Sequence, residues 1–196
     1  MNIVHVGCGK RNWGKRFKFT DKDGNKVTAY VKHVDGGDYE HLDSKDIYLN
    51  DFKDDDLDLI YCSHMLEYFD REEVVGVLKA WMQKLKSGGK LYLAVPDFGA
   101  IAGMWHQERE PLHKFLGPLY GKMEMGSETI YHKTCYDESS LGELLRIVGY
   151  KRVELWEHDD LDWWEESWDD HSLAKIKRKY YAVDASISLN VVCEKK

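Results

Sequence analysis

The order of hydrophobic and polar positions along this chain predicts strands and helices in succession. Short apolar runs at 3–6, 57–62 and 90–95 end in glycine or polar residues, which is typical of buried strands. Between the first two runs, apolar and polar residues alternate on both sides of Asp23-Gly24-Asn25, so a β-hairpin is predicted over 16–34. The hairpin takes the place of an ordinary crossover helix, which we expect to be short or displaced.

Two amphipathic helices are predicted, each with a start and a stop signal. Asp70 is the expected N-cap of the first helix, Glu73 is its capping-box partner, and Gly88-Gly89 ends the helix. The second helix opens at Ser140 and ends at Gly149. Strand and helix therefore alternate, which favours a doubly wound α/β sheet.

Two final strands are expected at 152–156 and 186–193, and they give the sheet an antiparallel edge. The segment 98–136 lacks a clean period and is rich in Gly, Met, His and aromatic residues. This composition suits a substrate-binding insertion or lid better than a core element. We therefore expect residues 1–196 to form a single domain that carries this insertion.

Composition narrows the class of protein. The net charge of −7 and the pI near 5.7 argue against a general nucleic-acid binder, which needs excess Lys and Arg to neutralise phosphates. The four cysteines are scattered with no C-x-x-C pair, as in a reduced cytoplasmic protein, and no run of eighteen apolar residues suggests a membrane span.

Charge is spread unevenly along the chain. Lys10–Lys18 and Lys175–Lys179 are basic, whereas Glu154–Asp170 is acidic and contains four tryptophans. A solvated face is the ordinary interpretation of each charged run. A basic patch beside a ligand crevice could instead hold an anionic substrate, and the tryptophans could stack on a sugar or cover the sheet edge.

The first strand breaks directly into Gly7-Cys8-Gly9. Such a break occurs in tight turns that bind nothing and also in turns that let the backbone approach a nucleotide closely. Asp35 stands at the carboxyl end of the next predicted strand, where an acid can accept hydrogen bonds from both ribose hydroxyls. Together the two features favour an adenosine site.

Taken together, the motifs resemble those of a class I S-adenosylmethionine-dependent methyltransferase. The matching residues are VGCG (6–9), Asp35, Asn50-Asp51-Phe52, YCSHMLEYF (61–69) and KLKSGGKLYLAVPDF (84–98). The resemblance implies a mostly parallel, seven-stranded Rossmann-like sheet with an antiparallel last strand pair, here without the amino-terminal helix. It also implies the cofactor S-adenosylmethionine.

Within that class, the chain looks more like the compact methyltransferases associated with polysaccharide or nucleotide-sugar pathways. The residues that carry this likeness are Ser63-His64-x-Leu66-Glu67, Val95–Phe98, Tyr131-His132-Lys133, Asp169–Ser172 and Ser188–Val191. Two features depart from the pattern. The hairpin before Asp35 is longer, and Tyr68 stands where such enzymes often have His, which weakens an inherited metal or base role there.

The resemblance assigns the cofactor to residues that follow the strands. They are Val6, Gly7, Cys8, Gly9, Lys10, Asp35, Gly36, Asn50, Asp51, Phe52, Ser63 and His64. The glycines would admit the methionine portion, Asp35 the ribose and Asp51 the adenine amino group, with Phe52 beside the ring and the Ser63 backbone at the amino-acid end. Asp51 could equally be a solvated acid, because it stands in an Asp-rich stretch.

Methylation of a hydroxyl needs a group that takes up its proton, and His132, His64 and Asp97 are the candidates. A structural role is the alternative for each histidine, and Asp97 could orient a histidine instead of acting as the base. His64 and Glu67 share a helical face at i and i+3, but no third ligand is suitably spaced, so we expect no metal site and a structural Glu67.

The sequence therefore predicts an S-adenosylmethionine-dependent enzyme that O-methylates a saccharide or another small polar acceptor. Such a chain could be part of a larger glycan-modifying polypeptide. One alternative is a cofactor-binding scaffold of the same fold. Another is a nucleic-acid methyltransferase, although 63–66 lacks the Asn/Asp-Pro-Pro-Tyr/Phe motif of that group.

Overall fold

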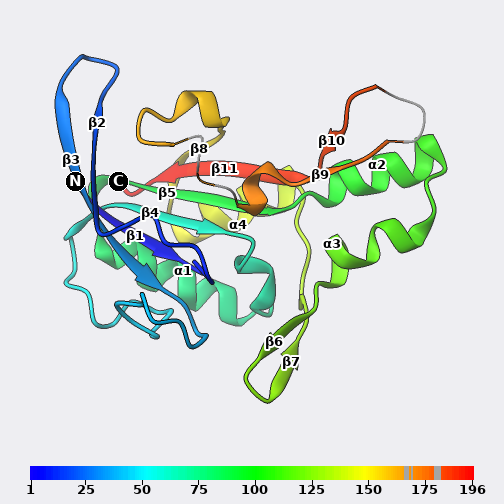
Figure 1. The fold of residues 1–196 in the computed structure, drawn as a ribbon, viewed down its shortest axis with the longest axis horizontal. Helices are drawn as coiled ribbons and strands as arrows, with labels where there is room; N and C mark the ends of the chain where they lie inside the picture. Colours follow the sequence, from blue (N-terminus) through cyan, green and yellow to red (C-terminus); the bar gives the residue numbers. More distant parts are fainter. Residues whose placement is uncertain (166–167, 169, 179–181) are drawn as a thin grey trace.

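A twisted β-sheet organises the computed structural model, which describes residues 1–165, 168, 170–178 and 182–196 (Figure 1). Within these residues the sheet has seven strands. Their spatial order is β2 (Arg16–Thr20), β3 (Lys26–Val34), β1 (Asn2–Val6), β4 (Leu57–Ser63), β5 (Leu85–Pro96), β11 (Ser188–Glu194) and β8 (Lys151–Leu155). Strands β3, β1, β4 and β5 are parallel, whereas β11 is antiparallel to β5 and β8. The predicted α/β class, with an antiparallel last strand pair, is confirmed.

The predicted hairpin is present and forms one edge of the sheet. Strand β2 pairs antiparallel with β3, with Phe17 opposite Ala29. Asp21 holds the turn, because its Oδ1 accepts hydrogen bonds from the backbone N–H groups of Asn25 at 2.7 Å and Asp23 at 3.1 Å. On the outer side of β3, the sheet therefore ends in the antiparallel strand β2. The apolar residues 47–49 form a turn and add no strand to the sheet.

One face of the sheet packs against helices α1 (Glu73–Lys84) and α4 (Glu138–Val148). The N-cap position of α1 is Glu72, two residues after the predicted Asp70, and it has no side-chain cap. Asp70 still holds the start of the helix, because its Oδ1 accepts from the Glu73 N–H at 2.8 Å. The Glu73 side chain accepts a hydrogen bond from the Tyr48 hydroxyl at 2.9 Å instead of from the Asp70 backbone. The predicted capping box between Asp70 and Glu73 is therefore only half formed. Helix α1 ends at Lys84, earlier than the predicted stop at Gly88, because β5 begins at Leu85.

Helix α4 begins earlier than the sequence pattern suggests. Its N-cap is Asp137, whose side chain accepts a hydrogen bond from the Ser140 N–H at 2.8 Å. The Ser140 hydroxyl in turn accepts one from the Asp137 N–H. Ser140 is therefore the third residue of the capping box and not the helix start. The predicted end at Gly149 is confirmed, with φ at 121°.

Aromatic side chains cover the opposite face of the sheet. Trp156 and Trp163 are 3% and 6% exposed and pack against Tyr61 and other residues of the sheet. The Trp13 and Trp168 rings stack with centroids 4.4 Å apart. Of the two roles considered for the tryptophans, the structure places Trp156 and Trp163 in the core that covers the sheet.

The segment 98–136 lies beyond the carboxyl end of β5 (Figure 1). It contains α2 (Phe98–Glu108), a 3-10 turn (Leu112–Lys114), α3 (Leu116–Tyr120) and the hairpin β6–β7 (Met123–Met125 and Glu128–Ile130). With β9 (Lys175–Ile176) and β10 (Ala185–Ser186) it forms a small separate core around Ile101, Met104 and Phe115. The helix α2 was not predicted from the sequence.

Short 3-10 turns complete the chain at Leu66–Tyr68, His158–Asp160 and His171–Leu173. Two positions of the sequence motifs, Asp169 and Lys179, lie outside the described residues. In the part of the chain that the structure describes, every helix is too short or too polar to cross a bilayer.

Candidate active site

A cavity of about 500 Å³ opens at the carboxyl ends of β1, β3 and β4. Its volume falls within the range of small-molecule sites. The predicted residues that line it are Gly7, Gly9, Asp35, Ser63, His64 and His132. The structure thus brings together the glycine turn, the acid after the second parallel strand and both candidate histidines.

The glycine turn needs glycine at its first position. Gly7 has φ of 70°, and a Cβ there would lie 2.7 Å from the Met65 Cβ. Gly9 also has a positive φ, of 54°, but a Cβ there would meet no atom within 4 Å. The backbone therefore turns at both glycines, while only Gly7 is in close contact with the segment after β4.

Asp35 is held by the turn that it faces. Its Oδ2 accepts from the Gly9 N–H at 2.9 Å and its Oδ1 accepts from the Gly37 N–H at 2.7 Å. A carboxylate has about four acceptor positions, so each Asp35 oxygen keeps one position for a ligand. Two adjacent hydroxyl groups, as on a ribose, suit this arrangement. The acid and the turn therefore fit the ribose of a nucleoside.

An acid and two imidazoles form a cluster at the cavity wall. The Oε1 atom of Glu67 lies 3.7 Å from both the Nδ1 of His64 and the Nε2 of His132. Glu67 is 0% exposed, and neither carboxyl oxygen has a hydrogen-bond partner among the described residues. Its backbone carbonyl accepts from the N–H groups of Lys133 and Thr134, which fastens the segment of His132 to this wall.

Burial sets the protonation of this cluster. It raises the pKa of Glu67 to about 8, because a carboxylate loses its hydration inside the protein. Burial also lowers the pKa of His64 to about 3, with smaller contributions from the nearby titratable groups of His171, His132 and Arg11. Burial lowers the pKa of His132 as well. At pH 7 the predominant form has a protonated Glu67 and two neutral imidazoles.

Glu67 was interpreted from the sequence as structural, and its place in the cavity was missed. The i and i+3 spacing pairs it with His64, but its second neighbour, His132, comes from a distant segment. The Tyr131-His132-Lys133 motif was the one signal that could have suggested the contact. Among the described residues, no three His, Cys, Asp or Glu side chains are arranged to hold a metal ion.

The expected adenine loop is not among the residues that line this cavity. Asn50 is exposed, Asp51 accepts a hydrogen bond from the Ser44 hydroxyl at 2.9 Å, and Phe52 is buried beside Lys32. The turn at 46–52 packs Leu49 and Phe52 inward, which leaves Asp51 on the surface.

The remaining cofactor candidates flank the glycine turn without lining the cavity. Val6 and Cys8 are buried, and the Cys8 Sγ lies 3.6 Å from the His41 Nε2. Lys10 and Gly36 are exposed. A Cβ at Gly36 would lie 3.5 Å from the Cε of Met125, so the β6–β7 hairpin approaches the turn after β3.

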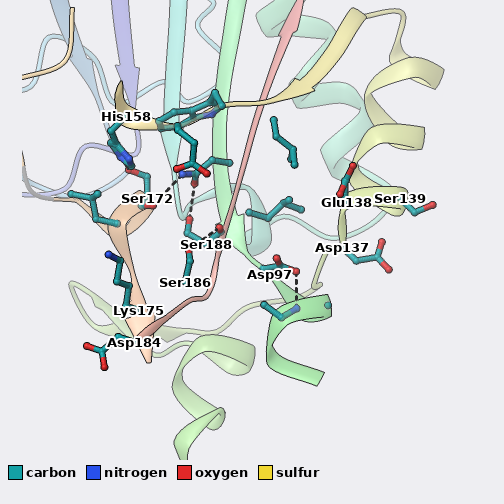
Figure 2. A pocket seen from close by; sticks show the side chains of 18 residues that line it. Asp97, Asp137, Glu138, Ser139, His158, Ser172, Lys175, Asp184, Ser186 and Ser188 are labelled. Atoms are coloured by element: carbon teal, nitrogen blue, oxygen red, sulfur yellow. Dashed lines mark hydrogen bonds between the residues drawn. The ribbon is translucent and has the colours of Figure 1, made fainter. Parts of the chain in front are cut away.

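Asp97 lines a different cavity, of about 760 Å³, which Figure 2 shows. Its carboxylate is the N-cap of α2 and accepts from the Ala100 N–H at 3.1 Å. Ser188 also faces this second cavity (Figure 2). Its Oγ lies 3.0 Å from the His64 Nε2. His64 therefore stands between the two cavities, whereas Asp97 does not line the first.

The fold is a Rossmann-like α/β fold, and its candidate site is a cavity at the carboxyl ends of the parallel strands in which Asp35 is suited to a ribose. Residues 4–93, a little less than half of the chain, match the family model described as a methyltransferase domain. This range contains the glycine turn, Asp35 and Glu67. No curated protein has a sequence that matches the chain.

Solved structures with a similar fold include several that are described as methyltransferases. One from Archaeoglobus fulgidus, described as dependent on S-adenosylmethionine, is 16% identical with a TM-score of 0.54, over 99% of this chain and 86% of that one. A possible histamine N-methyltransferase from Thermotoga maritima is 14% identical with a TM-score of 0.52, over 100% and 82%.

A third similar structure contains ligands. It is the Burkholderia thailandensis 1,6-didemethyltoxoflavin-N1-methyltransferase with bound 1,6-didemethyltoxoflavin and S-adenosylhomocysteine, 12% identical with a TM-score of 0.52, over 99% of this chain and 70% of that one. These identities are low, so the likeness concerns the fold. It confirms the predicted class of fold, and with the family match it agrees with the predicted methyltransferase activity and cofactor.

Proposed function

We propose that this chain is an S-adenosylmethionine-dependent methyltransferase that methylates a hydroxyl oxygen of a saccharide or another small polar acceptor. The observation that carries the proposal is one cavity that unites the glycine turn and Asp35 with two imidazoles of lowered pKa, those of His64 and His132. Asp35 and the glycines suit the donor. The imidazoles suit the proton of the acceptor.

S-adenosylmethionine, when bound, supplies a methyl group on a positively charged sulfur. The acceptor oxygen would take this methyl group from the sulfur, which would leave as the neutral thioether, and the imidazole of His132 or His64 would take up the hydroxyl proton. Asp35 and the turn at Gly7 would orient the donor, because correct alignment supplies much of the rate of a displacement. Burial keeps His132 and His64 neutral at pH 7, as a proton acceptor must be.

His132 is packed so that its ring can lie in the cavity. A Cβ at Gly121 would come 2.5 Å from this ring, so only glycine leaves it room. The Tyr68 ring meets the His132 ring edge to face at 4.7 Å between centroids. His64 remains the second candidate base, and Asp97 is a candidate for an acceptor that reaches both cavities.

The segment 98–136 is proposed to bind the acceptor, because Gly117, Pro118, Lys122 and Met123 line the donor cavity. The second cavity is lined by hydroxyl, amide and carboxylate groups, which are suited to hydrogen bonding with a polyhydroxylated acceptor. A reducing compartment such as the cytoplasm suits the four cysteines, all of which are described and unpaired.

Calorimetry with S-adenosylmethionine and S-adenosylhomocysteine tests the donor site. We expect Asp35→Ala to weaken binding at least about a hundredfold, because hydrogen bonds to a charged group contribute about 1.5–3 kcal/mol each. Asp51→Ala is the matched control, since Asp51 is an acid of the same predicted site that does not line the cavity. Failure of the unmodified protein to bind either ligand would refute the proposal.

Transfer is tested with methyl-labelled donor and a panel of monosaccharides and nucleotide sugars. We expect label in an acid-stable ether of the acceptor, with His132→Ala losing transfer while keeping donor affinity. Donor binding without transfer to any acceptor would favour the scaffold alternative. Salt-dependent binding and labelling of DNA or RNA would favour the nucleic-acid alternative.

A further inference from the structure

Glu67 is an unusual residue for the wall of a binding cavity. Its side chain is completely buried, yet both carboxyl oxygens are without a hydrogen-bond partner among the described residues. Buried polar groups are nearly always paired, and an unpaired one destabilises the folded protein by about 1–3 kcal/mol. The methyl-transfer step proposed above gives this carboxyl no task. A group of this kind suggests a partner that arrives with the ligand.

We propose that Glu67 provides the counter-charge for the positively charged sulfur of S-adenosylmethionine. The inference rests on the proposed function and deepens it. Glu67 lines the same cavity as Gly7, Gly9 and Asp35, so the donor would occupy the space in front of it. The interaction is electrostatic and acts through the low dielectric of the protein, so the carboxyl need not touch the ligand.

The groups that surround the carboxyl leave it available for this role. Four elements contribute: the strand β4 and the turn after it, the 3-10 turn at Leu66–Tyr68, the segment 131–136 and the loop after β1. Their titratable or charged groups near Glu67 or in the cavity are Cys62, His64, Tyr68, His132, Tyr136 and Arg11, joined by Asp35, Lys122 and His171. The two imidazoles nearest to the Glu67 carboxyl are neutral at pH 7.

If Glu67 balances the charge of the donor sulfur, its carboxyl must lose a proton when the donor binds. Without a ligand Glu67 keeps its proton, because burial raises its pKa to about 8. A cation in the cavity favours the carboxylate, so the O–H bond of Glu67 breaks and its proton passes to the solvent. After transfer the sulfur of the product is neutral, and Glu67 takes a proton back. The site therefore distinguishes the charged donor from the neutral product.

Calorimetry at pH 7 in buffers of different ionisation enthalpy counts the protons released on binding. Glu67→Gln is the matched variant, because the amide has the same shape and cannot ionise. We expect the unmodified protein to release nearly one proton more than this variant when S-adenosylmethionine binds. We expect no such excess with S-adenosylhomocysteine. Comparison with the variant cancels the titration of the ligands' own amino groups.

The same pair of proteins should differ in pH dependence. A pKa of about 8 for the free protein implies that donor affinity rises about tenfold between pH 7 and pH 9 relative to Glu67→Gln. The product affinity of the two proteins should show no such divergence. Should Glu67→Gln fail to fold, carbon-13 spectra of labelled glutamates in the unmodified protein give the answer. The pKa of the buried carboxyl should fall with donor and not with product.

Three results separate the possibilities. Equal proton release by the unmodified protein and Glu67→Gln would overturn this inference and leave the proposed function intact. A Glu67 resonance that stays protonated with donor bound would do the same. Failure of both ligands to bind the folded, unmodified protein would instead refute the proposed function itself.

Discussion

The glycine turn gives a sharp test, because its two glycines share a backbone conformation but differ in their surroundings. An alanine at either position adopts a left-handed backbone, which costs about 1–2 kcal/mol. At Gly9 no atom lies within 4 Å of the new methyl group. At Gly7 the methyl group would lie 2.7 Å from the Cβ and 2.8 Å from the Cγ of Met65, and overpacking of this kind costs about 1–3 kcal/mol more.

We therefore expect Gly9→Ala to lower the free energy of unfolding by about 1–2 kcal/mol and Gly7→Ala to lower it by about 2–5 kcal/mol. The position of the Met65 Cβ is fixed by the backbone, so a change of the Met65 rotamer cannot remove the contact. Urea unfolding followed by tryptophan fluorescence measures both values. A midpoint shift without a change in slope would assign the effect to stability.

The two variants also differ in their expected effect on the cavity. Gly7→Ala pushes against Met65, which lines the cavity, so affinity for S-adenosylhomocysteine should fall with stability. The reasoning would be refuted if Gly9→Ala were as destabilising as Gly7→Ala. It would also be refuted if Gly7→Ala left both unfolding and binding unchanged.

Two further changes test the core. Trp163→Ala should lower the free energy of unfolding by about 3–5 kcal/mol and leave the affinity for S-adenosylhomocysteine unchanged. Trp105→Ala, at a side chain that is 50% exposed, should lower the free energy of unfolding only slightly. Equal losses of stability in the two variants would contradict the difference in burial. Burial lowers the pKa of His33 to about 4, below its unfolded value near 6.5. Stability should fall by up to about 1.4 kcal/mol per pH unit from pH 6.5 towards 4, and urea midpoints for His33→Gln should show a weaker slope.

Local chemistry made several elements predictable from the sequence. The hairpin follows from a turn in which Asp21 accepts backbone hydrogen bonds, and the start of α1 follows from Asp70 in the same way. The end of α4 follows from Gly149, whose φ of 121° few other residues adopt. In each case the responsible atoms lie within five residues of the boundary that they set.

The site was less predictable, because its parts meet across long sequence separations. No spacing rule connects Glu67 with His132, which reach 3.7 Å only after the segment 98–136 has folded back to the sheet. Asp97 accepts a hydrogen bond from the Ala100 N–H because it is the N-cap of α2. The sequence of α2 has only weak hydrophobic periodicity, so the helix, and with it this role of Asp97, was not predicted. The expectation that Asn50–Phe52 hold the adenine came from the resemblance alone. In this chain Phe52 packs inward, and the loop does not line the donor cavity.

The aromatic cover of the sheet has a consequence for the order of folding during synthesis. Strands β1, β3 and β4 come from the first 63 residues, but the ring that stacks on Trp13 belongs to Trp168. A growing chain would expose one apolar face of these strands until that late segment leaves the ribosome. Such a face invites aggregation or chaperone binding. We therefore expect the last quarter of the chain to control the yield of folded protein, although the glycine turn, Asp35 and Glu67 of the donor cavity all belong to the first half.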